Sequence, residues 1–452
     1  MIKKNKLNFL LDGCAGSSGK GKMAAFLVKN NKIDYLVTSN TANASHTVVE
    51  KGKEYVFKVL PSGVLYHEKI EKVFIADGAG FVVADLFKEI EMTGIPLEKI
   101  FISPRAAIIT QIDKDYENGL CDLQGEYFET RQDGTLRTGT TASGSGAVLA
   151  KKVLRIKNLV TAGDLEELKP FITDVGTEIM KINGKKTGLF EIGQGYPLSN
   201  NHPMFAPFTT SRNVTVAAAL NDAMLSPSIV GNVFINFRTF PIKIHNYKYL
   251  ATEDKEYSYP ASSAAWVEKN HCPHHTIVSD GVTITVNIFK DTFLSYYEKD
   301  FVLNERIDSH SGEFYPDQEE ITWEELNSRI GDPEPPILEC TTLTKLPRRV
   351  AEFSKENLID AVVHNVSPFD TFVSVNFANY VDPVLEDCHG SYKWSNSTKF
   401  NDWLVENIVK VQMTLLKDYD ILFGIALIGT GAETDSTITV DEYSTTNNTI
   451  TG

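Results

Sequence analysis

The sequence predicts an α/β fold built on a large central, mostly parallel β-sheet with flanking helices. The chain has 452 residues, 42% of them apolar, which is enough for a substantial core. At about 150 residues per domain, this length fits either roughly three domains or one large α/β enzyme domain. An apolar run, a glycine-rich turn and a helical pattern follow one another near the N-terminus, and further apolar runs alternate with helical segments. This alternation is typical of βαβ units, in which neighbouring strands run parallel.

The first elements can be predicted in order. Residues 7–12 (LNFLLD) read as a buried strand, residues 13–21 as a glycine-rich turn and residues 22–30 as a helix. Further strands are predicted at 34–39 and at 72–75, and glycines follow the second of these. Ligands of such sheets bind at the carboxyl ends of the strands. We therefore expect the functional site where these glycine-rich turns gather.

The domain organisation follows from changes in composition along the chain. Residues 1–435 are predicted to form one domain, with an insertion of loops and short strands at about 242–300, where Tyr, His and Lys are frequent and periodicity is weak. Residues 436–452 are polar and rich in Thr and Asn. They predict a tail that is partly disordered or that adds an edge strand.

The charge balance excludes some classes of partner. There are 44 Lys and Arg residues against 59 Asp and Glu residues, a net charge of −15, whereas binding to nucleic acid depends on neutralising phosphates with basic residues. No apolar run approaches a membrane span of about 18 residues, and the five cysteines form no C-x-x-C pair. We expect no nucleic acid and no membrane as partners, and a location in a reducing cytoplasm.

The turn at residues 13–22 (GCAGSSGKGK) has the character of a phosphate-binding loop. It lies between a predicted strand and a predicted helix, where glycines let backbone N–H groups converge on phosphate oxygens at the positive end of the helix. It is not a Walker A loop, because Gly21 stands where a Mg²⁺-binding Ser or Thr would follow the lysine. An ordinary tight turn between strand and helix is the alternative.

Further motifs follow this loop in order. They are NASHT (43–47), LPSG (60–63), TGTTASGSG (138–146), EIGQGYPL (191–198), TTSRN (209–213), TKLPRR (344–349) and GTG (429–431). Together with the phosphate loop, this series resembles the adenylosuccinate synthetase family, whose corresponding loops include WGDEGKGK, NAGHT and IPSG. The resemblance implies a carbon–nitrogen ligase that joins a purine monophosphate to L-aspartate at the expense of a nucleoside triphosphate.

The resemblance also implies a role for individual residues. It assigns the triphosphate to Ser17, Ser18, Gly19, Lys20, Gly21, Lys22, Ser45, His46, Thr47, Asn376, Gly429 and Gly431. It assigns the purine monophosphate to Ser17, Asn43, Thr140, Thr141, Arg155, Gln194, Leu198, Thr210 and Ile235. It assigns aspartate to Thr342, Thr344 and Arg348. Arg155 falls where the family supplies an arginine to the neighbouring subunit, which implies a homodimer.

Three departures from the family pattern bear on the substrates. Ser17 replaces the catalytic aspartate, Ala378 replaces the aspartate that reads the guanine of GTP, and Leu346 replaces the first arginine of the aspartate loop. They resemble a phage-type branch of the family that joins dGMP to aspartate with ATP or dATP, toward 2-aminoadenine. A carboxylate gripping N1–H would crowd the C2 amine of guanine, whereas a shorter serine hydroxyl can accept a hydrogen bond from it. The alternatives are a conventional synthetase acting on IMP with GTP, and an inactive nucleotide-binding homologue.

The implied chemistry assigns catalysis to Ser17, Lys20 and His46, with Mg²⁺ bridging the phosphates. By the same resemblance, Ser17 and the backbone carbonyl of Ser45 are the protein neighbours of the metal. Serine at its usual pKa cannot take the N1 proton as a carboxylate does, so another group or an oxygen of the substrate must act as the general base. Asp12, at the end of the first predicted strand, is either that substitute acid–base group or a cap for the following turn. If the protein is encoded by a phage, we expect it in the cytoplasm of the host cell.

Overall fold

The structure is a computed structural model of the chain. It describes residues 1–129, 141–244, 247–249, 274–279, 282–287, 307–309, 311–340, 347–391, 393 and 397–440.

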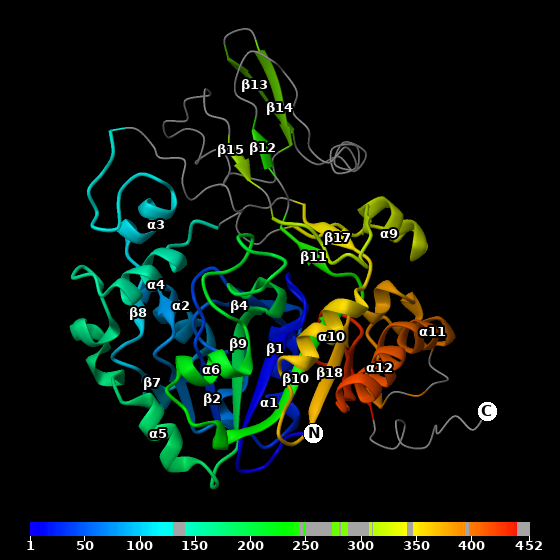
Figure 1. Cartoon of the computed structure of the whole chain (residues 1–452), viewed down its shortest axis with the longest axis horizontal. Coiled ribbons are helices and arrows are strands. Elements are labelled where there is room, and N and C mark those ends of the chain that lie inside the picture. The colour runs from blue at the N-terminus through cyan, green and yellow to red at the C-terminus, as the bar shows by residue number, and fades with distance from the viewer. Residues whose placement is uncertain are drawn as a thin grey trace.

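A ten-stranded sheet forms the centre of the molecule (Figure 1), with the strand order β19-β21-β20-β18-β10-β1-β9-β2-β5-β7. Its strands are β1 Leu7–Asp12, β2 Tyr35–Thr38, β5 Lys72–Ile75, β7 Ile100–Ile102, β9 Gly188–Gly195, β10 Val230–Arg238, β18 Thr371–Asn376, β19 Gly390–Ser391, β20 Gly424–Gly429 and β21 Thr437–Thr439. Every pairing in this sheet is parallel except that of β20 with β21. The predicted α/β fold with a mostly parallel sheet is confirmed.

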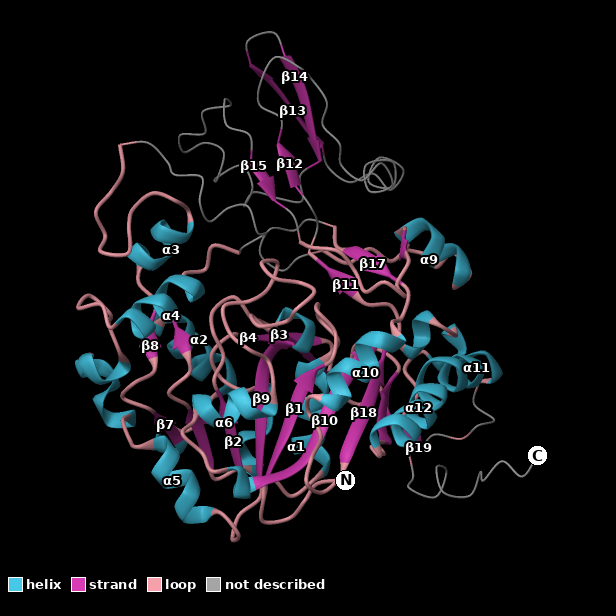
Figure 2. Cartoon of the chain, viewed as in Figure 1, coloured by secondary structure: helices cyan, strands magenta, loops and turns pink. Residues whose placement is uncertain are grey.

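Helices cover the sheet on both faces and at its ends (Figure 2). They are α1 Lys20–Asn30, α2 Val83–Thr93, α3 Gln111–Glu117, α4 Ser145–Leu154, α5 Val175–Ile182, α6 Val216–Asp222, α9 Trp323–Arg329, α10 Lys355–Val363, α11 Thr398–Leu404 and α12 Lys410–Tyr419. In Figure 1, α2, α3 and α4 (blue to cyan) gather toward the β7 end, and α9 to α12 (yellow to red) toward the β18 end. No helix in the described part of the chain has the length and apolar character needed to span a bilayer.

β1 shows why the sequence forms this sheet. It lies between β9 and β10, and all six of its residues are buried. Leu7, Phe9 and Leu11 pack into the core on one face, whereas Leu10 packs into a separate core that includes α1 on the other face. A strand buried on both faces requires a continuous apolar run, which explains why residues 7–12 were predictable. The predicted helix at 22–30 begins two residues earlier, at Lys20.

Shorter strand pairs lie outside the central sheet. They are β3 His46–Glu50 with β4 Lys53–Phe57, β6 Gly80–Phe81 with β8 Ala107–Ile108, β12 Tyr247–Tyr249 with β15 Ile307–Ser309, and β13 His274–Ser279 with β14 Val282–Asn287. β11 Ile242–Lys243, β16 Glu320–Ile321 and β17 Arg349–Ala351 form a three-stranded sheet. The predicted insertion at 242–300 therefore falls between β10 and β18 of the central sheet, and much of it lies outside the described residues.

The start of the predicted tail adds a strand to the central sheet, which is one of the two outcomes expected for it, although the strand lies next to the edge strand β19 and not at the edge itself. Residues 437–439 form β21, which pairs with both β20 and β19. Ser436, Thr437 and Ile438 are buried. The domain therefore extends at least five residues beyond the boundary expected at 435, because the polar Thr-rich sequence pairs with β20 through its backbone. Residues 441–452 of the expected tail lie outside the described residues.

Candidate active site

The glycine-rich turn connects the end of β1 to the start of α1. Gly19 is the cap of α1 and has a left-handed backbone with φ of 81°, which glycine adopts at little cost. At Gly13 a side chain would meet Phe237, since an added Cβ would lie 2.1 Å from that ring. The turn therefore brings the N-terminus of α1, where backbone N–H groups are free of helical partners, to the carboxyl edge of the sheet.

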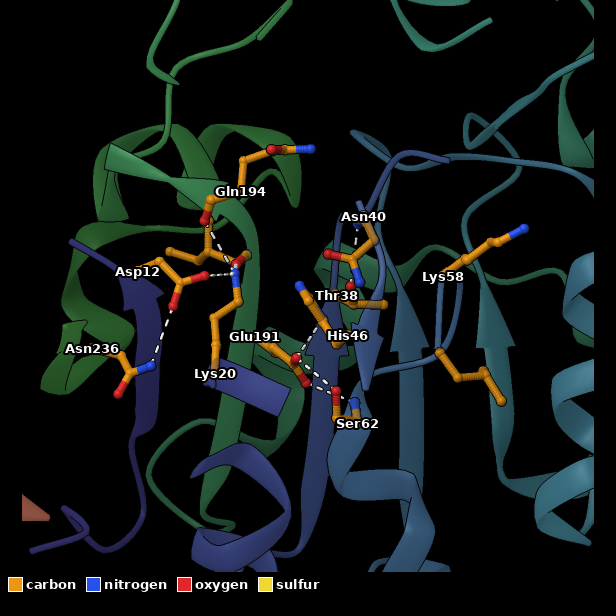
Figure 3. Close-up of polar contacts among 12 residues, drawn as sticks. Asp12, Lys20, Thr38, Asn40, His46, Lys58, Ser62, Glu191, Gln194 and Asn236 are labelled. Carbon is orange, nitrogen blue, oxygen red and sulfur yellow. Dashed lines mark hydrogen bonds and ion pairs between the residues drawn. The ribbon is translucent and has the colours of Figure 1, made fainter. Parts of the chain in front are cut away.

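Lys20 is the most tightly held charged residue of this turn. Only 2% of it is exposed, and its ammonium nitrogen lies 3.1 Å from Asp12 Oδ2. It also donates hydrogen bonds to the carbonyls of Ile192 and Gln194 at the end of β9. Figure 3 shows these contacts, which join the ends of β1 and β9.

Asp12 contacts further polar groups as well as Lys20. Its Oδ1 accepts hydrogen bonds from the Ser18 hydroxyl and from Asn236 Nδ2, the latter at 3.3 Å. Asn236 also donates to the Ser18 carbonyl at 2.8 Å, and its own oxygen accepts from Asn376 Nδ2 at 2.7 Å. A buried polar network thus runs from Lys20 on α1 to Asn376 at the end of β18.

His46 lies at the start of β3 and faces β9. Its Nδ1 is 2.6 Å from Glu191 Oε1. The Glu191 carboxylate also accepts from the Ser62 backbone N–H at 2.7 Å and from the Ser62 hydroxyl at 2.8 Å. Burial acts to raise the pKa of Glu191, but His46, Lys20 and Ser62 together hold it below its ordinary value. An ionised Glu191 therefore fixes the His46 ring and leaves Nε2 as the ring nitrogen directed elsewhere.

Sequence reasoning gave Glu191 no role, although it quoted the EIGQG motif that contains it. The signal was a carboxylate near the carboxyl end of a strand otherwise made of apolar residues and glycines.

Several residues expected at the purine monophosphate come together. Asn43 Nδ2 donates to the Thr210 hydroxyl at 3.1 Å, and the Asn43 backbone N–H donates to the Ser145 hydroxyl at 3.1 Å. Ser145 is the first residue of α4, and through Ser143 it links to the exposed Thr141, whose hydroxyl donates to Ser143 Oγ at 3.2 Å. Asn43, Thr141 and Thr210 are therefore neighbours at the N-terminus of α4.

Leu198 joins this group, whereas Gln194 lies at the end of β9 beside Lys20. Gln194 has a left-handed backbone with φ of 69°, and its side chain points away from the Lys20 ammonium (Figure 3). The Leu198 carbonyl accepts from the Thr210 N–H at 2.7 Å. Leu198 therefore joins the group formed by Asn43, Thr141 and Thr210.

The residues expected at the base of the triphosphate also meet. A Cβ added to Gly429 would lie 1.9 Å from Asn376 Oδ1 and 2.6 Å from Lys22 Nζ, and one added to Gly19 would lie 3.1 Å from Asn376 Cγ. The ends of β18 and β20 and the start of α1 are thus in contact around Asn376.

Lys22 does not face the phosphate turn. Its ammonium donates to the carbonyls of Gly431, at 2.8 Å, and Ser436, at 3.2 Å. Burial lowers the pKa of Lys22 to about 7, although Asp387 and Glu386 act to raise it. The side chain holds the 429–436 loop to α1, beside Gly429 and Gly431, which were also expected at the triphosphate. A contact between Lys22 and phosphate stays a prediction.

Arg238 was missed by sequence reasoning and lies fully buried beneath the turn. Its guanidinium forms an ion pair with Glu339, donates to the Ser17 carbonyl at 2.8 Å and lies 3.9 Å from the Phe377 ring centroid. Burial acts to lower the pKa of Arg238, but Glu339 keeps it above its ordinary value. The signal in the sequence was a single charged residue at the carboxyl end of the apolar strand VGNVFINFR.

Arg348, expected to bind aspartate, lies beside this pair. Its Nε donates to the Cys340 carbonyl at 3.1 Å, and its backbone N–H donates to the Glu339 carbonyl at 2.9 Å. Burial lowers the pKa of Arg348, and the Glu339 carboxylate acts in the opposite direction. The structure thus brings Arg348 toward the turn that carries Ser17. Thr342, Thr344 and Leu346 lie outside the described residues, as does Thr140.

Some expected residues stand apart from these groups. Ile235 is 0% exposed in the middle of β10, where its side chain belongs to the hydrophobic core and not to a binding surface. Arg155 is exposed at the end of α4 in a left-handed conformation, and Ser17 and Thr47 are exposed as well. Ser45 is half-buried beside His46. Within the described ranges, no three His, Cys, Asp or Glu side chains are arranged to bind a metal ion.

Comparison with known proteins identifies the class of enzyme. Residues 14–165 match the adenylosuccinate synthetase family. The adenylosuccinate synthetase of Methanocaldococcus jannaschii is 30% identical over 240 residues, which cover 52% of this chain and 65% of the relative. Residues 14–165 thus match an adenylosuccinate synthetase domain, and the chain is similar to carbon–nitrogen ligases of this kind.

Two phage proteins of the same name align along most of the chain. The N6-succino-2-amino-2'-deoxyadenylate synthase of Vibrio phage phiVC8 is 26% identical over 389 residues, which cover 84% of this chain and 87% of the phage protein. The protein of the same name from Salmonella phage PMBT28 is 26% identical over 402 residues, covering 85% of this chain and 88% of that protein.

Solved structures share the fold. The cyanophage S-2L succinoaminodeoxyadenylate synthetase bound to dGMP and dATP superposes with a TM-score of 0.66 at 22% identity, covering 97% of this chain and 96% of that chain. The fully ligated adenylosuccinate synthetase of Plasmodium falciparum gives a TM-score of 0.58 at 17% identity, covering 96% of this chain and 99% of that chain.

Proposed function

We propose that this protein condenses dGMP with L-aspartate, using ATP or dATP, to give N6-succinyl-2-amino-2'-deoxyadenylate, ADP or dADP, and phosphate. The product would supply 2-aminoadenine for DNA synthesis. The observation that carries the proposal is the meeting of Lys20, His46 and Gln194 around the carboxyl end of β9, linked by Asp12 and Glu191. Similarity to phage synthases along most of the chain supports the choice of dGMP.

The reaction would run in two steps. Guanine O6 attacks the γ-phosphorus of the triphosphate while the N1 proton leaves, so that the bond to the β-phosphate breaks and a 6-phosphoryl intermediate forms. The aspartate amine then attacks C6, and phosphate departs. His46, oriented by Glu191, would donate a hydrogen bond to the transferring phosphoryl group and O6, and Lys20 would neutralise phosphate charge. Such chemistry depends mainly on positioning and electrostatic stabilisation.

Ser17 and Ala378 support the choice of nucleotides. Ser17 offers a hydroxyl and no carboxylate near the purine, which leaves room for the C2 amine of guanine. Ala378 is buried in the segment that follows β18, so the position that would read guanine in a triphosphate has no carboxylate. Without that carboxylate the site can accept an adenine triphosphate, since adenine no longer leaves a buried hydrogen-bond acceptor unpaired.

Mg²⁺ would be held at the turn by the exposed Ser17 hydroxyl and the Ser45 carbonyl, together with substrate phosphates and water. Oxygen donors of this kind fit Mg²⁺, which seldom takes a cage made only of protein groups. When bound, the ion supplies charge neutralisation on the triphosphate.

Aspartate and the second subunit would complete the site. Arg348 would bind an aspartate carboxylate, since guanidinium pairs with carboxylates through two parallel hydrogen bonds; Thr342 and Thr344 would assist. Arg155 is exposed at the end of α4, as a residue that reaches a neighbouring subunit in a homodimer would be.

Asp12 is the residue that the sequence offers as a substitute acceptor of the N1 proton. Asp12 is only 5% exposed and contacts Lys20, Ser18 and Asn236. These contacts favour a role for Asp12 in the turn and in positioning Lys20 over a role as general base.

One experiment tests the proposal against its alternatives. The protein is incubated with aspartate and Mg²⁺, with dGMP, GMP and IMP crossed against ATP, dATP and GTP, and product masses are measured. We expect a succinyl adduct of dGMP with ATP or dATP. An adduct of IMP alone, formed with GTP, would identify a conventional synthetase, and the absence of any adduct would favour an inactive nucleotide-binding homologue.

A further inference from the structure

Asn40 is a buried carboxamide whose side chain has no hydrogen-bond partner among the residues that the structure describes. It lies two residues beyond the end of β2 and is 2% exposed. Its backbone is fully engaged, since the N–H donates to the Thr38 hydroxyl at 3.2 Å and the carbonyl accepts from the Gly80 N–H at 3.0 Å. Within the described ranges, neither Oδ1 nor Nδ2 of its side chain has a partner. Because both atoms are unpartnered, the finding does not depend on which way round the amide is placed.

Such a group lowers folding stability unless a ligand pairs with it. A buried donor or acceptor that loses water without gaining a partner costs free energy, whereas an apolar side chain of the same shape does not. Leucine, which has nearly the same shape as asparagine, would therefore be favoured at this position if only packing mattered.

The place where the carboxamide lies indicates which ligand it meets. A Cβ added to Gly193 would lie 2.7 Å from Asn40 Oδ1, so the amide rests against the Gly193 backbone. The carbonyls on either side of Gly193, those of Ile192 and Gln194, accept hydrogen bonds from Lys20. Thr38, two residues before Asn40, is the register partner of Glu191, which holds His46. In Figure 3 the Asn40 oxygen points toward the side on which His46 and Lys20 lie.

The hydrogen-bonding groups of a carboxamide indicate which part of the ligand it pairs with. It presents one acceptor and one donor side by side, whereas phosphate and carboxylate groups accept only. A purine presents matching pairs, namely N1–H beside O6 and, in guanine alone, the 2-amino group beside N3. Lys20 and the hydroxyls near Asn43 are the groups suited to phosphate.

We propose that Asn40 is a specificity-determining residue that pairs with the base of the purine monophosphate. This inference rests on the proposed function, because it takes the ligand to be the purine monophosphate that reacts beside His46 and Lys20.

The test measures binding separately from turnover. Dissociation constants for dGMP, dIMP and ATP are measured by calorimetry for the wild type, Asn40→Ala and Asn40→Leu. We expect dGMP to bind about tenfold to a hundredfold more weakly to both variants, as for the loss of one or two buried hydrogen bonds. ATP should bind within about twofold of the wild type. If dIMP loses as much affinity as dGMP, Asn40 pairs with the N1–H and O6 edge of the base. If only dGMP loses affinity, Asn40 pairs with the edge that carries the 2-amino group. Both results support the proposal.

Stability distinguishes recognition from folding. Asn40→Leu should keep or raise the thermal midpoint, since it removes an unpaired polar group. The matched control is Asn232→Ala near the amino end of β10, where the amide donates to the Met1 carbonyl at 2.6 Å and accepts from the Asp370 N–H at 3.2 Å. It should lower the midpoint and leave dGMP affinity unchanged.

Two results would overturn the inference. One is unchanged dGMP affinity in both Asn40 variants, and the other is an equal loss of affinity for ATP. If the wild type binds dGMP but forms no succinyl adduct, the proposed function fails while the binding measurement still decides the role of Asn40.

Discussion

The Lys20 ammonium lies 3.1 Å from the Asp12 carboxylate, and both side chains are almost fully buried. A buried ion pair is stable only when its remaining hydrogen bonds are satisfied, and here the Ile192 and Gln194 carbonyls satisfy the lysine while Ser18 and Asn236 satisfy the aspartate. The charge that a phosphate would meet is thus held in place by the fold before any ligand binds.

Asp12→Asn tests whether this residue positions Lys20 or takes a proton. The amide keeps the shape but leaves the Lys20 charge uncompensated, so we expect a lower thermal midpoint and a fall in kcat of about tenfold. Loss of a general base would lower kcat by about 10²-fold or more without loss of stability. The matched control is Asp34→Asn, since Asp34 accepts from the Thr187 N–H at the opposite end of the sheet. It should affect stability alone.

Glu191→Gln should disturb the orientation and charge of His46. We expect kcat to fall by about 100-fold, the range typical of a misplaced acid–base group, while KM for the triphosphate changes little. Glu89→Gln is the control, since Glu89 is also a buried carboxylate but binds the N–H groups of residues 58–60. If the Glu191 and Glu89 variants lost activity equally, the pairing with His46 would have no catalytic role.

Arg238→Met should destabilise the protein strongly. The substitution leaves Glu339 partly buried without its partner, and breaking a buried pair in this way costs about 3–5 kcal/mol. The double variant Arg238→Met with Glu339→Gln removes the stranded charge and should recover part of the loss in urea denaturation. If the double variant loses as much free energy of unfolding as the two single variants lose together, the two residues are not coupled.

The lowered pKa of Lys22 should make the stability of the protein depend on pH. Its pKa in the folded protein is about 7, against an ordinary value of 10.5, because of burial. Between these pH values the unfolded chain binds more protons than the folded one, so the contribution of Lys22 to the free energy of unfolding rises with pH.

We therefore expect urea denaturation at pH 7, 8 and 9 to show that the free energy of unfolding of the wild type rises relative to that of Lys22→Met. The rise should be at most about 1.4 kcal/mol per pH unit. A constant difference across this range would contradict the shifted pKa. The same variant should raise KM for the triphosphate, since Lys22 holds the loop that carries Gly431.

The two lysines of the glycine-rich turn show the limit of sequence reasoning. With the helix predicted to begin at residue 22, Lys20 and Lys22 were both assigned to phosphate. The helix in fact begins at Lys20, and residues two apart in a helix point about 200° away from each other. Lys20 therefore faces β9, and Lys22 faces the loop after β20.

The sequence by itself determined the first elements of the sheet and the resemblance to the adenylosuccinate synthetase family. The apolar run of β1, the glycine-rich turn after it and the ordered motifs are local patterns, and local patterns depend on neighbours in the chain. The partners of the site residues were decided only by the tertiary structure: Asp12 with Asn236, His46 with Glu191, and Arg238 with Glu339. Each pair is separated by more than a hundred residues in the chain. The strand order of the central sheet places Asp12 of β1 beside Asn236 of β10, and the packing of the β3–β4 pair and of the segment around Glu339 against this sheet brings the other two pairs together.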